Sequence, residues 1–199
     1  MHLTKKTATM KHIESFAKLL SSQQLVFVKH SPAQYAKYKY CLENVAHHTQ
    51  QFGGKPICGW RFRNHEPQGM PQQYYLTAEH HCIWLNNDIL LDITPLPQDK
   101  VLYPLMNQGN HIFLPDNNAD PIWNSAMLAP LPVQYYAIDN NQSLKEYVNV
   151  LQEKEWNTYQ EELVEALSTV GTSLQAKKII EKITRDKYFT TLWSNIATT

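Results

Sequence analysis

The strongest constraint on the fold is a pair of strand-like segments joined by a short turn sequence at residues 74–93. Residues 74–85 and 89–93 are rich in aromatic and branched side chains, whereas residues 86–88 read Asn-Asn-Asp, a composition typical of tight turns. Two such segments joined so closely predict a β-hairpin. Another strand is predicted over residues 56–62, followed by a loop at 64–72 that carries Pro67, Gly69 and Pro71.

A helix is predicted directly before this sheet, beginning near Cys41. Apolar residues at Leu42, Val45 and Ala46 recur at helical spacing, and Gly53-Gly54 ends the pattern. An amphipathic helix is also predicted over residues 11–21, leading into an extended segment at 24–28. We therefore expect an α+β fold in which the helix that carries Cys41 packs on an antiparallel sheet.

The second half of the chain has a different character. Prolines recur through residues 94–133, which predicts an ordered coil wrapped over the core. A capping-box pattern at 143–146, with Ser143 as the cap, predicts a helix to about residue 167, and Gly171 separates it from a second helix that begins near residue 174. These segments predict an α+β core over 1–140 and a C-terminal helical hairpin over 141–199, packed on the same domain.

Composition argues against several function classes. The 199-residue chain carries 18 Lys and Arg against 18 Asp and Glu, so its net charge of zero gives no global field to attract nucleic acid. No apolar run reaches the roughly 20 residues of a membrane-spanning helix, and no signal-peptide core follows the N-terminus. With three cysteines, at least one thiol is expected to be free unless chains cross-link. We expect a cytoplasmic protein without a cofactor; secretion without a cleaved signal stays open, and no oligomeric state is selected.

The order of a thiol, an imidazole and a carboxylate along the chain indicates a cysteine-dependent active site. Cys41 lies near a predicted helix N-terminus, where unpaired backbone N–H groups and the helix dipole stabilise a thiolate. His81 lies on the predicted hairpin and can act as general base, and Asp92 on the neighbouring strand can orient the His81 ring. These residues predict a Cys-His-Asp triad that forms a covalent acyl intermediate.

Several residues are candidates for supporting roles. Because side chains alternate along a strand, His80 and His81 point to opposite faces, and His80 is the alternative histidine. An oxyanion needs hydrogen-bond donors beside the thiol, and the Cys41 backbone N–H with Asn44 or Gln34 are the candidates. Thr94 shares a face with Asp92 and is expected to support it.

The same residues resemble two groups of known proteins. The motifs are similar to those of a family of small bacterial proteins of uncharacterised role, and more distantly to transglutaminase-like and papain-like folds, in which a helix carries the cysteine and a following sheet carries the histidine and aspartate. The resemblance implies the histidine role for His81 and spans residues 41–95. The matching motifs are Cys41-Leu42-Glu43-Asn44, Gly53-Gly54, Gly59-Trp60, Glu79-His80-His81-Cys82-Ile83-Trp84 and Asp92-Ile93-Thr94-Pro95.

Two other function classes remain open. Nine histidines and three cysteines include potential zinc ligands, although no Cys-x-x-Cys pair is present, so no metal residues are assigned. A non-enzymatic module that binds a partner through the proline-rich segment or the helical hairpin is the other alternative. For the enzyme, the sequence is compatible with a protein or peptide substrate but selects none, and it does not distinguish a peptidase, amidase, deamidase or transglutaminase.

Overall fold

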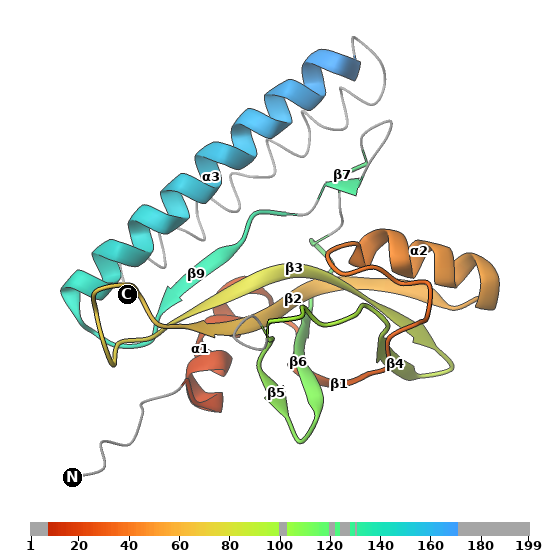
Figure 1. Cartoon of the computed structure of the whole chain (residues 1–199), viewed down its shortest axis with the longest axis horizontal. Helices are drawn as coiled ribbons and strands as arrows, with labels where there is room; N and C mark the ends of the chain where they lie inside the picture. Colours follow the sequence, from red (N-terminus) through yellow and green to blue (C-terminus); the bar gives the residue numbers. More distant parts are fainter. Residues whose placement is uncertain (1–7, 100–102, 120–121, 124–127, 130, 171–199) are drawn as a thin grey trace.

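A computed structural model describes residues 8–99, 103–119, 122–123, 128–129 and 131–170 of this chain (Figure 1). The fold is mixed α+β, as predicted. In order along the chain, its elements are α1 (Met10–Leu20), β1 (Val26–His30), α2 (Cys41–Phe52), β2 (Lys55–His65), β3 (Tyr75–Asn86), β4 (Ile89–Asp92), β5 (Met106–Asn107), β6 (Asn110–Pro115), β7 (Ile122–Trp123), β8 (Leu128–Ala129), β9 (Gln134–Ala137) and α3 (Gln142–Val170).

The main sheet closes on itself into a barrel. Its strands follow the order β1-β4-β3-β2-β6, and β6 pairs back with β1. The predicted hairpin is present as β3 and β4, which pair antiparallel with Trp84 opposite Leu91. The sheet was predicted to be antiparallel, but β1 runs parallel to β4. Strand β1 lies beside β4, the second strand of the hairpin, and its pairing with β6 on the other side closes the barrel.

The proline-rich segment was expected to be coil throughout, and this expectation is wrong for β5, β6, β7 and β8. Strand β6 pairs antiparallel with both β1 and β2 and completes the barrel. Between Pro104 and Pro115 the chain has no proline, and the apolar sequence Ile112-Phe113-Leu114 is buried. Because proline lacks a backbone N–H, a stretch of ten residues without proline can form all the backbone hydrogen bonds that a strand needs.

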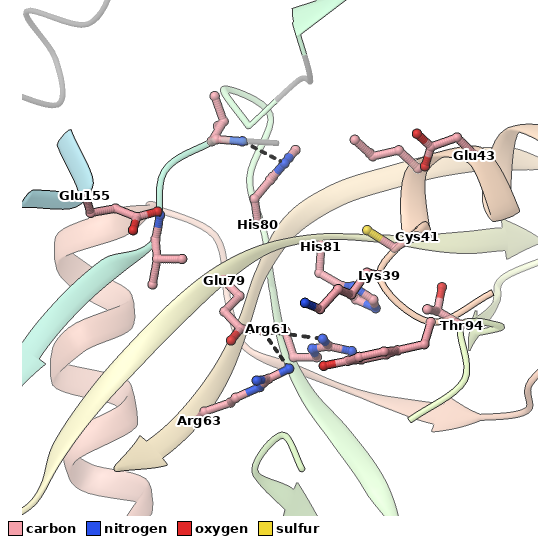
Figure 2. A pocket seen from close by; sticks show the side chains of 14 residues that line it. Lys39, Cys41, Glu43, Arg61, Arg63, Glu79, His80, His81, Thr94 and Glu155 are labelled. Carbon is pink, nitrogen blue, oxygen red and sulfur yellow. Dashed lines mark hydrogen bonds and ion pairs between the residues drawn. The ribbon is translucent and has the colours of Figure 1, made fainter. Parts of the chain in front are cut away.

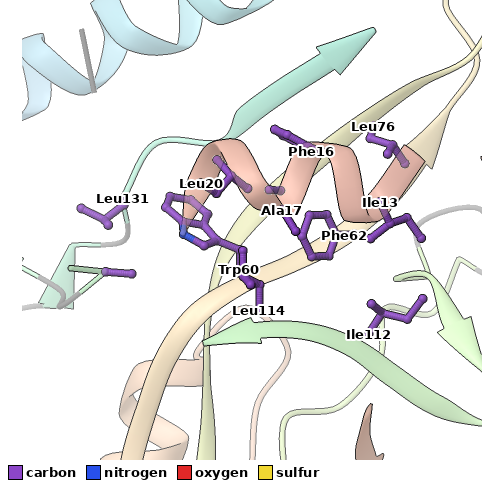
Figure 3. Packing of buried hydrophobic residues seen from close by; sticks show 12 residues of the cluster. Ile13, Phe16, Ala17, Leu20, Trp60, Phe62, Leu76, Ile112, Leu114 and Leu131 are labelled. Carbon is purple, nitrogen blue, oxygen red and sulfur yellow. The ribbon is translucent and has the colours of Figure 1, made fainter. Parts of the chain in front are cut away.

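Helix α1 covers the outer face of the barrel and builds the largest apolar cluster (Figure 3). Ile13, Phe16 and Leu20 recur at helical spacing and are almost completely buried. Phe16 meets the ring of Phe62 edge-on at a centroid distance of 5.8 Å. The predicted N-terminal helix is therefore confirmed, and its apolar face anchors it to the sheet.

Helix α2 also packs on the outer face, beside a second cluster. Leu42 and Val45 are buried there with Cys82, Trp84 and, from the segment after β4, Ile93. The helix begins at Cys41 and ends before Gly53, whose φ of 72° lies in the left-handed region that glycine tolerates. The predicted position of Cys41 at a helix N-terminus is confirmed.

Helix α3 packs on β3 and β9 through its first turns. Leu144 and Val148 are buried against Tyr75. The cap is Asn141, whose Oδ1 accepts a hydrogen bond from the Leu144 N–H, rather than Ser143, which is exposed. The predicted second helix of the hairpin lies outside the described residues. Within the described part of the chain, no helix has the length and apolarity to span a membrane.

Candidate active site

The barrel interior changes from apolar to polar along its length. Val28, Ile83 and Phe113 form an apolar cluster contributed by three strands. Two residues from Ile83 and Phe113, on the same side of their strands, lie His81 and His111. Both residues are at most 2% exposed, and between them lies Asp92, which is 0% exposed. The site is thus a buried polar group at one end of an apolar barrel.

Asp92 is the acceptor that joins this group. Its Oδ2 accepts hydrogen bonds from His81 Nε2 at 2.8 Å and from His111 Nδ1 at 2.7 Å. Its Oδ1 accepts the backbone N–H of Thr94 at 3.0 Å. The predicted pairing of His81 with Asp92 is therefore present. Because a carboxylate can only accept, His81 carries its proton on Nε2, which leaves Nδ1 as the basic nitrogen.

The charges in this group follow from burial and hydrogen bonding. Burial opposes ionisation of Asp92, but the charge interaction with His81 and the hydrogen bonds from both imidazoles outweigh it, so the pKa of Asp92 lies well below its usual value. Burial, with the nearby Arg61 charge, lowers the pKa of His81 to about 4 despite the opposing effect of Asp92. At neutral pH, Asp92 is an anion and His81 a neutral base.

Cys41 approaches this group at an open edge of β3. On that edge β9 pairs with residues 75–78 and β4 pairs with residues 84–86. Residues 79–83 face no other strand on this edge among the described residues. The half-buried Cys41 lies here, and its sulfur receives a hydrogen bond from the backbone of Cys82. The gap lets a residue from the outer helix reach a cavity that the barrel histidine also lines.

The Cys41 thiol is protonated in the resting protein. Burial raises the pKa of Cys41 to about 11, and Asp92 and Cys58 add to this. The Cys82 backbone hydrogen bond and the Arg61 charge act in the opposite direction but are smaller. The thiolate stabilisation expected at a helix N-terminus therefore does not dominate, and no hydrogen bond joins Cys41 to His81 in the described part of the chain.

A cavity of about 620 Å³ connects the predicted nucleophile and base (Figure 2). Cys41, His81 and Thr94 all line it, together with Arg61 and Arg63. This volume lies within the range of small-molecule and peptide-side-chain sites. A substrate carbonyl can therefore enter a space bordered by both a thiol and an imidazole.

His80 also lines the cavity, but its ring is engaged elsewhere. Its Nδ1 accepts the backbone N–H of Leu131 at 3.1 Å, and its Nε2 donates to the Ala119 carbonyl at 2.6 Å. Both nitrogens thus connect β3 to the segments that follow β6. Of the two adjacent histidines, only His81 pairs with a carboxylate.

The predicted supporting residues occupy three different environments. Asn44 is buried, donates to the Lys37 carbonyl at 2.8 Å and Thr94 Oγ1 at 3.3 Å, and accepts from the Lys37 N–H at 3.0 Å. Its amide therefore fixes the segment before α2 instead of facing the cavity. Gln34 is exposed and does not line the cavity. Thr94 lines the cavity and contacts Asp92, as expected.

Three residues of the site were missed by the sequence analysis. His111 lies on β6, which was expected to be coil, so its alternation with Phe113 was not used. Arg61 lies between Trp60 and Phe62, and a charged residue between two aromatic residues in a strand was the available signal that it points to the opposite face. His30 extends the group, because its ring stacks on His111 at 4.7 Å and its Nε2 donates to the Thr94 carbonyl at 2.9 Å.

The zinc alternative finds no supporting geometry. Among the described residues, no three His, Cys, Asp or Glu side chains are arranged to hold a metal ion. Comparison with known proteins adds no relative: no family model, no curated protein and no solved structure matches this chain.

Proposed function

We propose that this protein is a cysteine-dependent acyl-transfer enzyme in which Cys41, His81 and Asp92 form the catalytic triad. The observation that carries the proposal is the buried hydrogen bond of 2.8 Å from His81 Nε2 to Asp92 Oδ2, at a cavity that Cys41 also lines. The carboxylate fixes the ring so that Nδ1 is the free base. The fold around the triad, a cysteine helix beside a sheet with the histidine and aspartate, supports a papain-like or transglutaminase-like relationship.

The reaction begins from an uncharged pair. A thiol with a pKa of about 11 and an imidazole with a pKa of about 4 do not form a resting ion pair. As the Cys41 sulfur attacks the carbonyl carbon, its proton moves to His81 Nδ1 and the carbonyl oxygen becomes the oxyanion. Collapse of this intermediate expels an amine, which takes the proton from His81. Water or a second amine then resolves the thioester and regenerates the thiol.

Acetylation by p-nitrophenyl acetate tests this reaction without a known substrate. We expect Cys41 to gain an acetyl group faster than Cys58 and Cys82, as read by peptide mass spectrometry. His81→Gln removes the base, so the acetylation rate at Cys41 should fall about 100-fold. His47→Gln is the matched control, because His47 is an exposed residue of the same helix as Cys41, and this variant should retain the rate.

The pH profile separates general-base catalysis from simple thiol reactivity. With His81 as base, the rate should be nearly constant from about pH 5 to pH 8, because the pKa of His81 is about 4. An unassisted thiol with a pKa of about 11 should instead react about tenfold faster for each pH unit. A tenfold rise per unit in the native protein, unchanged in His81→Gln, would reject the triad.

A further inference from the structure

The most unusual group in the cavity is the Arg61 guanidinium. It is 7% exposed and lines the same cavity as Cys41 and His81. Its Nη2 contacts Glu79 Oε2 at 3.4 Å, but the same oxygen contacts Arg63 Nη2 at 3.0 Å. Two guanidinium groups therefore share one carboxylate oxygen, and within the described part of the chain Arg61 makes a single long hydrogen bond.

The other neighbouring carboxylate, that of Asp92, does not accept a hydrogen bond from Arg61. Arg61 Nη1 lies 3.8 Å from Asp92 Oδ2, which is beyond hydrogen-bond length. That oxygen already accepts from His81 and His111. Among the described residues, no group accepts a hydrogen bond from Arg61 Nε or Nη1, although both atoms are buried. A buried charged donor without an acceptor is unfavourable, so an acceptor from a ligand would be stabilising.

The charge of Arg61 acts on the reacting groups. It lowers the pKa of both Cys41 and His81, and all three side chains line one cavity. Lys39 lines the cavity as well (Figure 2). A ligand held by Arg61 would therefore lie beside the attacking sulfur.

Three carboxylates also line the cavity and would repel an anion. Glu79 is neutralised by its contacts with both arginines. Glu155 accepts the Val133 N–H at 3.1 Å, and Glu43 is exposed in the first turn of α2. None of them contacts Arg61 apart from Glu79, so the two free donors of Arg61 remain the anion-binding feature.

The geometry points to a carboxylate-binding subsite formed by Arg61 beside Cys41, so that the acyl donor carries a carboxylate close to the carbonyl under attack. This rests on the proposed function. Nε and Nη1 of Arg61 lie on different edges of the guanidinium, so a carboxylate would accept a charge-assisted hydrogen bond from one of them, or from Nη1 together with Nη2. The carboxylate belongs either to the C-terminus of a peptide or to an acidic side chain, and the two sources share the same chemistry.

Three matched small molecules test the subsite. N-acetylglutamine carries only an α-carboxylate, N-acetylisoglutamine carries only a side-chain carboxylate, and N-acetylglutaminamide is neutral. Each is titrated into the full chain with Cys41→Ser, and binding is followed by the NMR resonances of the arginine Nε–Hε groups. We expect at least one acid to bind about tenfold more tightly than the neutral amide, with affinity that decreases as salt increases. The acid that binds identifies the source of the carboxylate.

Variants assign the effect to Arg61. Arg61→Gln should remove the preference for the acid, whereas Lys55→Gln, which removes an exposed charge from the same strand, should retain it. If Arg61→Gln does not fold, the comparison of the two acids with the neutral amide in the Cys41→Ser protein still tests whether the subsite exists. Equal binding of all three molecules, or of none, would overturn the subsite. Acid-selective binding without acetylation of Cys41 would support the subsite while rejecting the proposed acyl transfer.

Discussion

The two faces of strands β2 and β3 differ sharply in chemistry. On the outer face, Trp60 and Phe62 pack under α1 in a cluster of apolar side chains. On the inner face, Arg61 pairs with Glu79, and His81 lies opposite Gly59 in the register. Residues one position apart thus belong either to the hydrophobic core or to the candidate site.

This difference separates the source of stability from the source of chemistry. The outer cluster is held by burial of apolar area, which tolerates small changes in shape. The inner group depends on hydrogen bonds to one buried carboxylate, and each donor there needs its partner. A change to the outer face should therefore alter stability alone, whereas a change to the inner face should alter both stability and reactivity.

The largest expected effect comes from the carboxylate at the centre of the inner face. Asp92→Asn places an amide where two imidazole N–H groups and one backbone N–H now meet acceptor oxygens. We expect the free energy of unfolding to fall by about 3–5 kcal/mol, measured by urea denaturation. Asp88→Asn makes the same change at an exposed turn position and should alter the free energy of unfolding by less than about 0.5 kcal/mol. Similar losses in the two variants would contradict the central role of Asp92.

The next effect is a loss of stability in acid. His81 has a pKa of about 4 in the folded protein and about 6.5 when unfolded, so the unfolded chain binds more protons between these values. Stability should therefore rise by about 3 kcal/mol from pH 4 to pH 6.5, as followed by denaturation at each pH. His81→Gln should flatten this rise. A slope that persists unchanged in the variant would mean that another group causes it.

At alkaline pH the sign reverses. The pKa of Cys41 is raised to about 11 in the folded protein, so the unfolded chain loses its proton first. Stability should then fall as pH rises from about 9 to 11. Cys41→Ser should reduce this alkaline decrease without abolishing it, because the pKa values of Cys82 and Tyr75 are also raised in the folded protein.

The positions of the three residues of the proposed triad were predictable from the sequence, but their environment was not. Helix and strand periodicity placed Cys41, His81 and Asp92 on their elements, because local patterns determine those elements. Burial of the Cys41 thiol depends on the packing of α2 against Cys58 and Cys82, residues that come later in the chain. A helix N-terminus predicted a lowered pKa, and tertiary packing raised it.

The part of the site that the sequence did not predict depends on closure of the barrel. His111 reaches Asp92 because β6 inserts between β2 and β1, a pairing between distant segments that no local pattern specifies. Asn44 and Gln34 were predicted from their nearness to Cys41 in sequence. The Asn44 amide instead forms hydrogen bonds with the backbone of Lys37, because helical geometry turns the Asn44 side chain towards the segment before α2.

A fourth test separates the two adjacent histidines. His80→Phe keeps an aromatic ring but leaves the buried Leu131 N–H without its acceptor. We expect a loss of about 1–3 kcal/mol in the free energy of unfolding. The flat pH profile of Cys41 acetylation should remain, because His80 makes no contact with Asp92. A rising profile in this variant would show that His80, rather than His81, supplies the base.

The smallest effects provide the most direct comparison of the two faces. Ile13 lies in the outer cluster and Ile83 in the barrel interior, and they are 2% and 1% exposed. Replacing either with valine removes one methylene and should cost about 1 kcal/mol. Only Ile83→Val should also slow Cys41 acetylation, because Ile83 packs with Phe113, whose ring meets His81 edge-on at 6.5 Å. If both variants slow acetylation equally, the outer core and the site are mechanically coupled, and the division between the two faces fails.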